Sequence, residues 1–168
     1  MEERFKNILW RQYGAAIDML DDAISTCPDR LWTAMLWEKQ DQPQHGQFWH
    51  VAFHALIWLD LYLTGSEKGF EPPAPFTEEG YPDEPYTKEE IRGYLLQCRG
   101  KCQSVILGLT DEKASQMCTF DFMELGFLEL QIYTMRHVQE HAAQLNLLLG
   151  QNGVTGQDWI AQARENVT

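Results

Sequence analysis

The sequence predicts an all-α protein: a four-helix bundle with a long crossover between its second and third helices and a short C-terminal helix. Apolar residues recur at helical spacing in four long segments. A proline- and glycine-rich stretch without periodicity divides these segments into two pairs, an arrangement typical of bundles with a crossover connection. No segment alternates strictly between apolar and polar residues, so we expect essentially no strand.

The first pair of helices is bounded by turn-forming residues. A helix is expected from residue 3 to about residue 26, where Pro28 ends the periodic pattern. A second is expected from about residue 47 to residue 64, stopped by Gly65. The segment between them, residues 28–46, has no clear assignment.

The second pair begins after a crossing loop at residues 66–86, which is acidic and contains five of the chain's prolines. Thr87 and Glu90 fit a capping box, in which each side chain bonds the other residue's backbone amide, and a third helix follows. Residues 111–121 form a second connection that can include a turn of helix. The strongest helical pattern runs from about residue 124 to residue 149, and a short amphipathic helix is expected over residues 155–165.

Composition and charge indicate the domain organisation and the classes of partner that are disfavoured. The 168 residues are 44% hydrophobic and carry a formal net charge of -12, which predicts one globular domain over residues 1–168. Such a charge disfavours contact with nucleic acid or with an anionic membrane surface. The acidic N-terminus lacks an apolar signal core and the four cysteines form no C-x-x-C pair. We therefore expect a cytoplasmic protein with reduced thiols.

The histidines carry the chemical information. His50 and His54 form one pair at i, i+4, and His137 and His141 form another, so each pair shares one helix face. His137 and His141 continue an apolar stripe on the last long helix, and the earlier pair follows the same rhythm on the second helix. Both pairs are therefore expected to face the same interior, where buried imidazoles need hydrogen bonds or a metal ion. His45 precedes the second helix and is interpreted as a loop residue.

Neutral imidazoles are good ligands for zinc, nickel, copper and iron. Three of them leave a coordination position open for water or substrate, as in catalytic rather than structural sites. The alternative is that the histidines are ordinary core residues with satisfied hydrogen bonds.

Two segments resemble the DinB-like (DinB/YfiT) superfamily. One runs from Phe48 to Trp58 (FWHVAFHALIW), and the other runs from Arg136 to Leu145 (RHVQEHAAQL) and contains H-x-x-x-H followed by Gln and Leu. The order of the motifs, the crossover and the length agree with that family over nearly the whole chain. The resemblance implies a four-helix bundle, often a homodimer, that binds a divalent metal, with zinc or nickel expected, through three histidines.

Residue by residue, the resemblance assigns the metal ligands to His50, His137 and His141, because Val51 and Ala52 reproduce the step that follows the family's second-helix ligand. His54 is the alternative third ligand or a neighbour of the site. Gln144, three residues after His141, is a candidate to support that ligand. Glu140 is interpreted as a solvated charge, and no catalytic residue can be assigned.

Family members that transfer low-molecular-weight thiols or hydrolyse small substrates imply a metal-dependent transferase or hydrolase acting on a small molecule. In such an enzyme the metal would activate a bound thiol or water. The alternatives are a bundle that binds a metal or small molecule without turnover, and a structural or interaction module without a metal.

Overall fold

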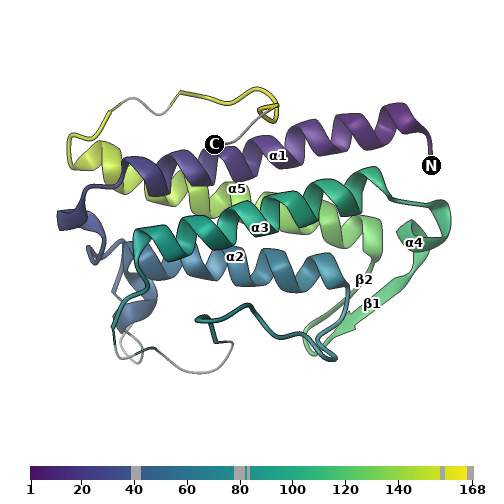
Figure 1. Ribbon diagram of the computed structural model, residues 1–168, viewed down its shortest axis with the longest axis horizontal. Helices are drawn as coiled ribbons and strands as arrows, with labels where there is room; N and C mark the ends of the chain where they lie inside the picture. The colour runs from purple at the N-terminus through teal and green to yellow at the C-terminus, as the bar shows by residue number, and fades with distance from the viewer. Residues whose placement is uncertain (39–42, 78–81, 83, 156–157, 166–168) are drawn as a thin grey trace.

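The computed structural model describes residues 1–38, 43–77, 82, 84–155 and 158–165. It is mostly helical, and four long helices dominate it (Figure 1). These are α1 (Glu3–Thr26), α2 (Phe48–Thr64), α3 (Lys88–Leu107) and α5 (Phe127–Gln151). Within these described ranges, no helix combines the length and apolar character needed to cross a membrane.

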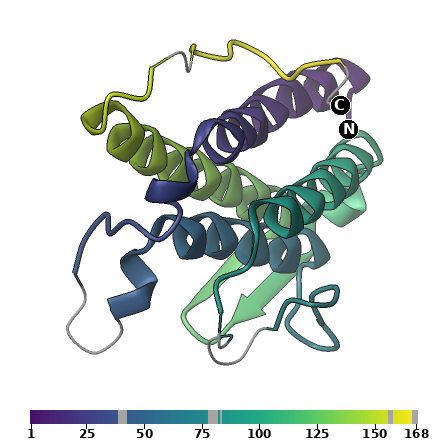
Figure 2. The same cartoon turned by 60° about the vertical axis from the view of Figure 1, so that its left-hand side comes forward.

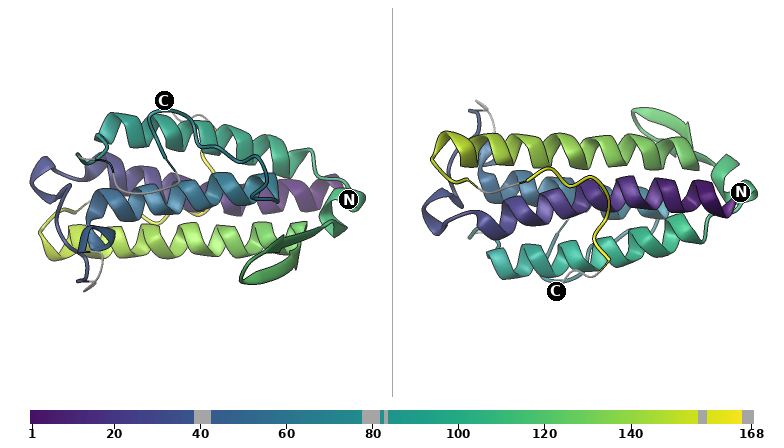
Figure 3. Two further views of the ribbon diagram at one scale, coloured as in Figure 1. Left: turned by 90° about the horizontal axis from the view of Figure 1, so that it is seen from below. Right: turned by 90° about the horizontal axis from the view of Figure 1, so that it is seen from above.

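The long helices lie side by side. Helices α1 and α2 each pack against both α3 and α5, and in the view from below α2 lies between α3 and α5 (Figure 3). Helices α1 and α5 run in one direction and α2 and α3 in the other (Figure 1). The core between them is apolar, and its fully buried side chains include Ile17, Leu56, Leu95 and Leu145. This packing brings α2 and α5, which carry the two histidine pairs, into direct antiparallel contact.

The crossover has no helix or strand in its described residues, as expected. Phe76 and Tyr86 fix it to the helices, since the Phe76 ring stacks on Tyr94 with a centroid distance of 4.7 Å and on Phe53 at 5.6 Å. The predicted capping box is confirmed at the start of α3. The Glu90 amide donates to Thr87 Oγ1 at 3.2 Å, and the Thr87 amide donates to Glu90 Oε2 at 2.8 Å.

The connection before α5 differs from the prediction that the chain has essentially no strand. The turn of helix is present as α4 (Asp111–Ser115), but it is followed by an antiparallel hairpin of β1 (Met117–Phe120) and β2 (Met123–Gly126). Alternate residues of β1, Cys118 and Phe120, are buried against the hydrophobic cluster beneath it. Helix α5 consequently begins at Phe127 rather than near residue 124.

The predicted C-terminal helix is also wrong in the described part of that segment, because residues 158–165 are not helical. The segment runs from the end of α5 back over α1 (Figure 2). The Ala163 amide donates to the Arg11 carbonyl at 2.7 Å, so this backbone group finds its partner on α1 instead of within a helix. The approach is close, since a Cβ added at Gly14 would lie 2.5 Å from that of Ala163.

Candidate metal centre

All five histidines of the chain gather where α2 meets α5. The rings of His137 and His141 have centroids 4.4 Å apart, and that of His54 lies 5.2 Å from the first and 5.0 Å from the second. His50 follows at 6.5 Å from His54, and His45 stacks on His50 at 4.6 Å. Residues distant in sequence, on two helices and a short turn, thus form one cluster of imidazoles.

Three of these rings aim the same nitrogen at a common region. The Nε2 atom of His137 lies 3.3 Å from Nε2 of His54 and 3.0 Å from Nε2 of His141. One ligand atom from each of the three residues lies within 4.8 Å of the other two. Tetrahedral zinc with Zn–N bonds of about 2.0–2.1 Å separates its ligand nitrogens by about 3.3–3.4 Å. The spacing and chemistry of this donor set therefore fit a divalent cation.

The three histidines lie at the edge of the α2–α5 contact rather than at its centre. Val138 and Ala142 occupy the fully buried positions of α5, and the neighbouring His137 and His141 are only half-buried. The helix repeat of 3.6 residues rotates the buried stripe away from a strict a/d pattern, so the two histidines lie beside the most deeply buried positions of α5. His54 is half-buried on the least covered face of α2. The three side chains are therefore partly exposed at the surface of the bundle.

Burial keeps these imidazoles neutral at physiological pH. It lowers the pKa of His54 to about 3, assisted by His141 and His137, which disfavour a further positive charge. Burial likewise lowers the pKa of His137 to about 4, again with a contribution from His141. The pKa of His141 is lowered as well, mainly by burial. Neutral imidazole offers the lone pair that a metal ion requires.

Gln144 orients His141. Its Oε1 atom lies 2.8 Å from His141 Nδ1 and can only accept a hydrogen bond, so Nδ1 of the neutral ring donates and Nε2 retains its lone pair. The Gln144 amide nitrogen in turn donates to Glu140 Oε1 at 3.5 Å. The predicted support of His141 by Gln144 is present as a hydrogen bond, and Glu140, interpreted from the sequence as a solvated charge, stands behind it. Such outer partners fix the tautomer of a metal-binding histidine.

Replacing Gln144 by alanine is expected to weaken metal binding about 10- to 100-fold, because His141 loses the partner that fixes its orientation. Competitive titration against a chromophoric chelator measures this. Gln139→Ala is the matched control, since Gln139 is on the same helix and points instead to Met19 Sδ at 3.4 Å. Equal affinity of the two variants would show that Gln144 does not support the site.

The close group of histidines in the structure differs from the ligand set that the family resemblance assigns. His137 and His141 are together, but the third member of the close group is His54, the alternative, and not His50. His50 lies one turn earlier on α2, with its ring between those of His45 and His54. His45, expected in a loop, lies in the short 3-10 helix η2 (Pro43–Gly46) and belongs to the wider cluster.

Comparison of the chain with models of protein families, with curated proteins and with solved structures gave no match. The DinB-like resemblance therefore stays a prediction.

Two aromatic residues next to the cluster had no functional assignment from the sequence. The ring of Trp58 is 6.1 Å from that of His54, and the ring of Phe122 is 6.0 Å from that of Trp58. Trp58 follows His54 by four residues, and this helical spacing is the signal that could have placed it beside the site. Phe122 is at the turn between β1 and β2, and its position depends on a hairpin that the sequence pattern did not predict.

Proposed function

We propose that this protein is a DinB-like four-helix bundle that binds a divalent metal ion through His54, His137 and His141, and that it is a metal-dependent transferase or hydrolase for a small molecule. The observation that carries the proposal is the convergence of three Nε2 atoms from two helices at spacings typical of a metal site. Zinc and nickel are the ions we expect, both of which accept imidazole ligands. The choice of His54 over His50 follows the geometry and not the family motif.

The residues of the site have different roles in the proposed function. The three imidazoles bind the ion, and Gln144 holds His141 in the tautomer that presents its lone pair. A divalent ion with three protein ligands keeps an open position, where it lowers the pKa of a water or thiol and supplies a nucleophile near neutral pH. Because the histidines are only half-buried, we expect a small substrate to approach that position from the surface. A low-molecular-weight thiol is the cosubstrate that the family resemblance favours.

A second candidate is a protein that binds a metal or small molecule without turnover. One observation favours it: in the part of the chain that the structure describes, these three imidazoles hydrogen-bond to one another and to Gln144. Among the described residues, no carboxylate hydrogen-bonds directly to these imidazoles to act as a general base, and Glu140 reaches His141 through Gln144. The lack of such a base disfavours hydrolysis more than it disfavours chemistry on a metal-bound thiol.

The experiment is metal titration followed by turnover. The purified chain, stripped with a chelator, is titrated with Zn²⁺, Ni²⁺ and Co²⁺, and we expect one ion per chain. The loaded protein is then given a panel of small thiols with an aryl halide electrophile, and separately a panel of amides and esters. Turnover that disappears in His137→Ala supports the enzyme. Binding of one ion without turnover supports the second candidate, and no metal uptake overturns the metal-dependent enzyme and the metal-binding form of the second candidate alike.

A further inference from the structure

Aromatic rings continue from the metal centre toward the β1–β2 hairpin. Trp58 lies one helical turn beyond His54, with ring centroids 6.1 Å apart in an edge-to-face arrangement. Phe122 extends the row, 6.0 Å from Trp58 and again edge to face. Trp58 is half-buried, whereas 60% of Phe122 is exposed. We name these two residues the aromatic wall, and it runs from a ligand imidazole to the surface of the molecule.

Helix α5 contributes an aromatic ring to the same side. Tyr133 lies one turn before His137, and because α5 runs antiparallel to α2, that turn also leads toward the hairpin (Figure 1). Tyr62 connects the two helices, since its ring is 5.2 Å from that of Trp58 and 6.0 Å from that of Tyr133. Tyr62 is only 2% exposed and closes the base of the row. Aromatic surface therefore borders the metal centre from both helices.

Polar groups adjoin the ligands on the opposite side of the centre. There His50 stands beside His54, and Gln144 stands beside His141. The aromatic wall thus lies on the hairpin side of the ligands, and the polar groups of His50 and Gln144 lie on the side toward the start of α2. Acidic Asp121 and Glu124, both exposed, flank the tip of the hairpin and disfavour an anionic group there.

We infer that the aromatic wall binds the uncharged aromatic ring of a small ligand whose oxygen or sulfur atom reaches the metal, so that the substrate is an aromatic compound with a metal-binding group. This inference rests on the proposed function, because it takes the metal centre as present. A ring separated from its metal-binding group by a short spacer spans the distance from the imidazoles to Trp58 and Phe122. Edge-to-face and offset contacts with these rings then favour an aromatic over a saturated ring.

The test uses Co²⁺-loaded protein and three hydroxamates that bind a metal through the same two oxygens: phenylacetohydroxamate, its cyclohexyl counterpart and acetohydroxamate. Changes in the visible absorption of Co²⁺ report the affinity of each. We expect the phenyl compound to bind about two- to ten-fold more tightly than the cyclohexyl compound, the range that aromatic pairs contribute beyond burial. Phe122→Ala and Trp58→Leu are each expected to reduce this ratio toward one.

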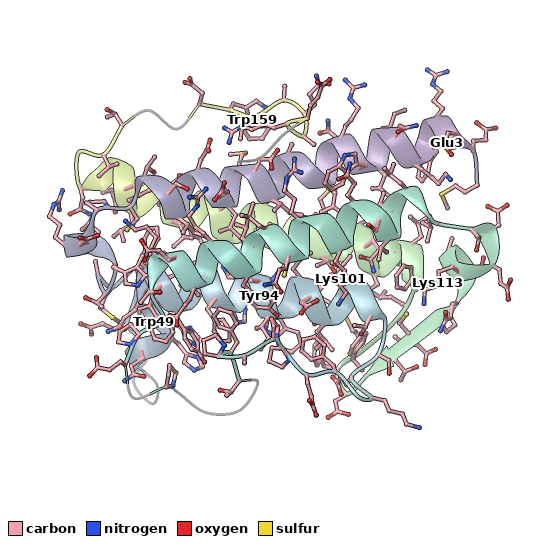
Figure 4. All side chains as sticks on the ribbon, in the orientation of Figure 1. Glu3, Trp49, Tyr94, Lys101, Lys113 and Trp159 are labelled. Carbon is pink, nitrogen blue, oxygen red and sulfur yellow. The ribbon has the colours of Figure 1, made fainter. Side chains whose placement is uncertain are left out.

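Trp159→Ala is the matched control, because Trp159 is an aromatic residue with 75% exposure that lies on the far side of α1 (Figure 4). It should leave the ratio unchanged. Equal affinity for the phenyl and cyclohexyl compounds in the unmodified protein overturns the inference and leaves the metal centre standing. A phenyl preference that survives both Phe122→Ala and Trp58→Leu also overturns it. If Co²⁺ binds but no hydroxamate alters its spectrum, the open position required by the proposed function is absent, and that proposal fails instead.

Discussion

Replacing His54 by alanine is expected to lower the affinity for Zn²⁺ or Co²⁺ by more than about 100-fold, beyond the loss caused by removing an outer partner. The reason is geometric: His54 supplies the only α2 nitrogen in the close group found among the described residues, 3.3 Å from His137 Nε2. His50→Ala is expected to change the affinity by less than about three-fold, because His50 stands outside that group. Competitive titration with a chromophoric chelator gives both values.

The two variants are matched controls for one another. Both histidines are half-buried on the same face of α2, so both substitutions remove similar packing. Circular dichroism and urea unfolding of the metal-free proteins verify that each variant is folded. A large loss in His50→Ala with a small loss in His54→Ala would make His50 the third ligand, as the sequence motif predicts. Small losses in both would leave His137 and His141 without a partner on α2.

Sequence spacing was sufficient to bring the two histidine pairs to one place but not to choose among their members. Each pair shares a helix face, and that much follows from a repeat of 3.6 residues. The choice between His50 and His54 depends on how far α2 is shifted along α5, because a shift of about 6 Å, the rise of four helical residues, would exchange the two positions. That shift is set by the packing of buried residues such as Leu56 and Leu145, which no local pattern encodes.

In the fold, too, some elements follow from local sequence patterns and others depend on contacts between distant residues. The long helices and the Thr87 cap follow from periodicity and capping chemistry, both of which act within a few residues. The β1–β2 hairpin does not, because its strands have four residues each and become favourable when Cys118 and Phe120 meet a cluster beneath them. Residues 158–165 have an amphipathic pattern, but contacts with α1 prevail over helix formation.

Asp18→Ala is expected to lower the free energy of unfolding by about 3–5 kcal/mol, the cost of breaking a buried ion pair by removing one partner. Asp18 is fully buried in α1, and its carboxylate accepts from Arg99 Nε at 2.7 Å and from the Arg164 amide at 2.7 Å. Arg99 is only 8% exposed, so the substitution leaves its guanidinium without the charge that compensates it. A loss of this size is a large part of the 5–15 kcal/mol, roughly, that stabilises a typical domain.

Asp22→Ala is the matched control, one turn further along α1. Asp22 binds Arg164 with two hydrogen bonds of 2.7 and 2.6 Å, but the side chain of Arg164 in that ion pair is 41% exposed and that of Asp22 25% exposed. Solvent screens such a pair, and its loss is expected to cost about 0–1 kcal/mol. Urea unfolding of both variants measures the difference, and equal losses would contradict the role of burial.

Amide hydrogen exchange separates this specific effect from general destabilisation. The Arg164 amide has Asp18 Oδ2 as its acceptor, so Asp18→Ala should speed exchange at Arg164 more than at the buried centre of α3. Asp18→Asn serves if the alanine variant does not fold, because its amide oxygen can still accept from the Arg164 amide while the charge opposite Arg99 is lost. Retained protection of Arg164 with a large loss of stability in Asp18→Asn would assign the stabilising effect to the ion pair between α1 and α3. Loss of both together would show that the C-terminal segment and the ion pair form one cooperative unit.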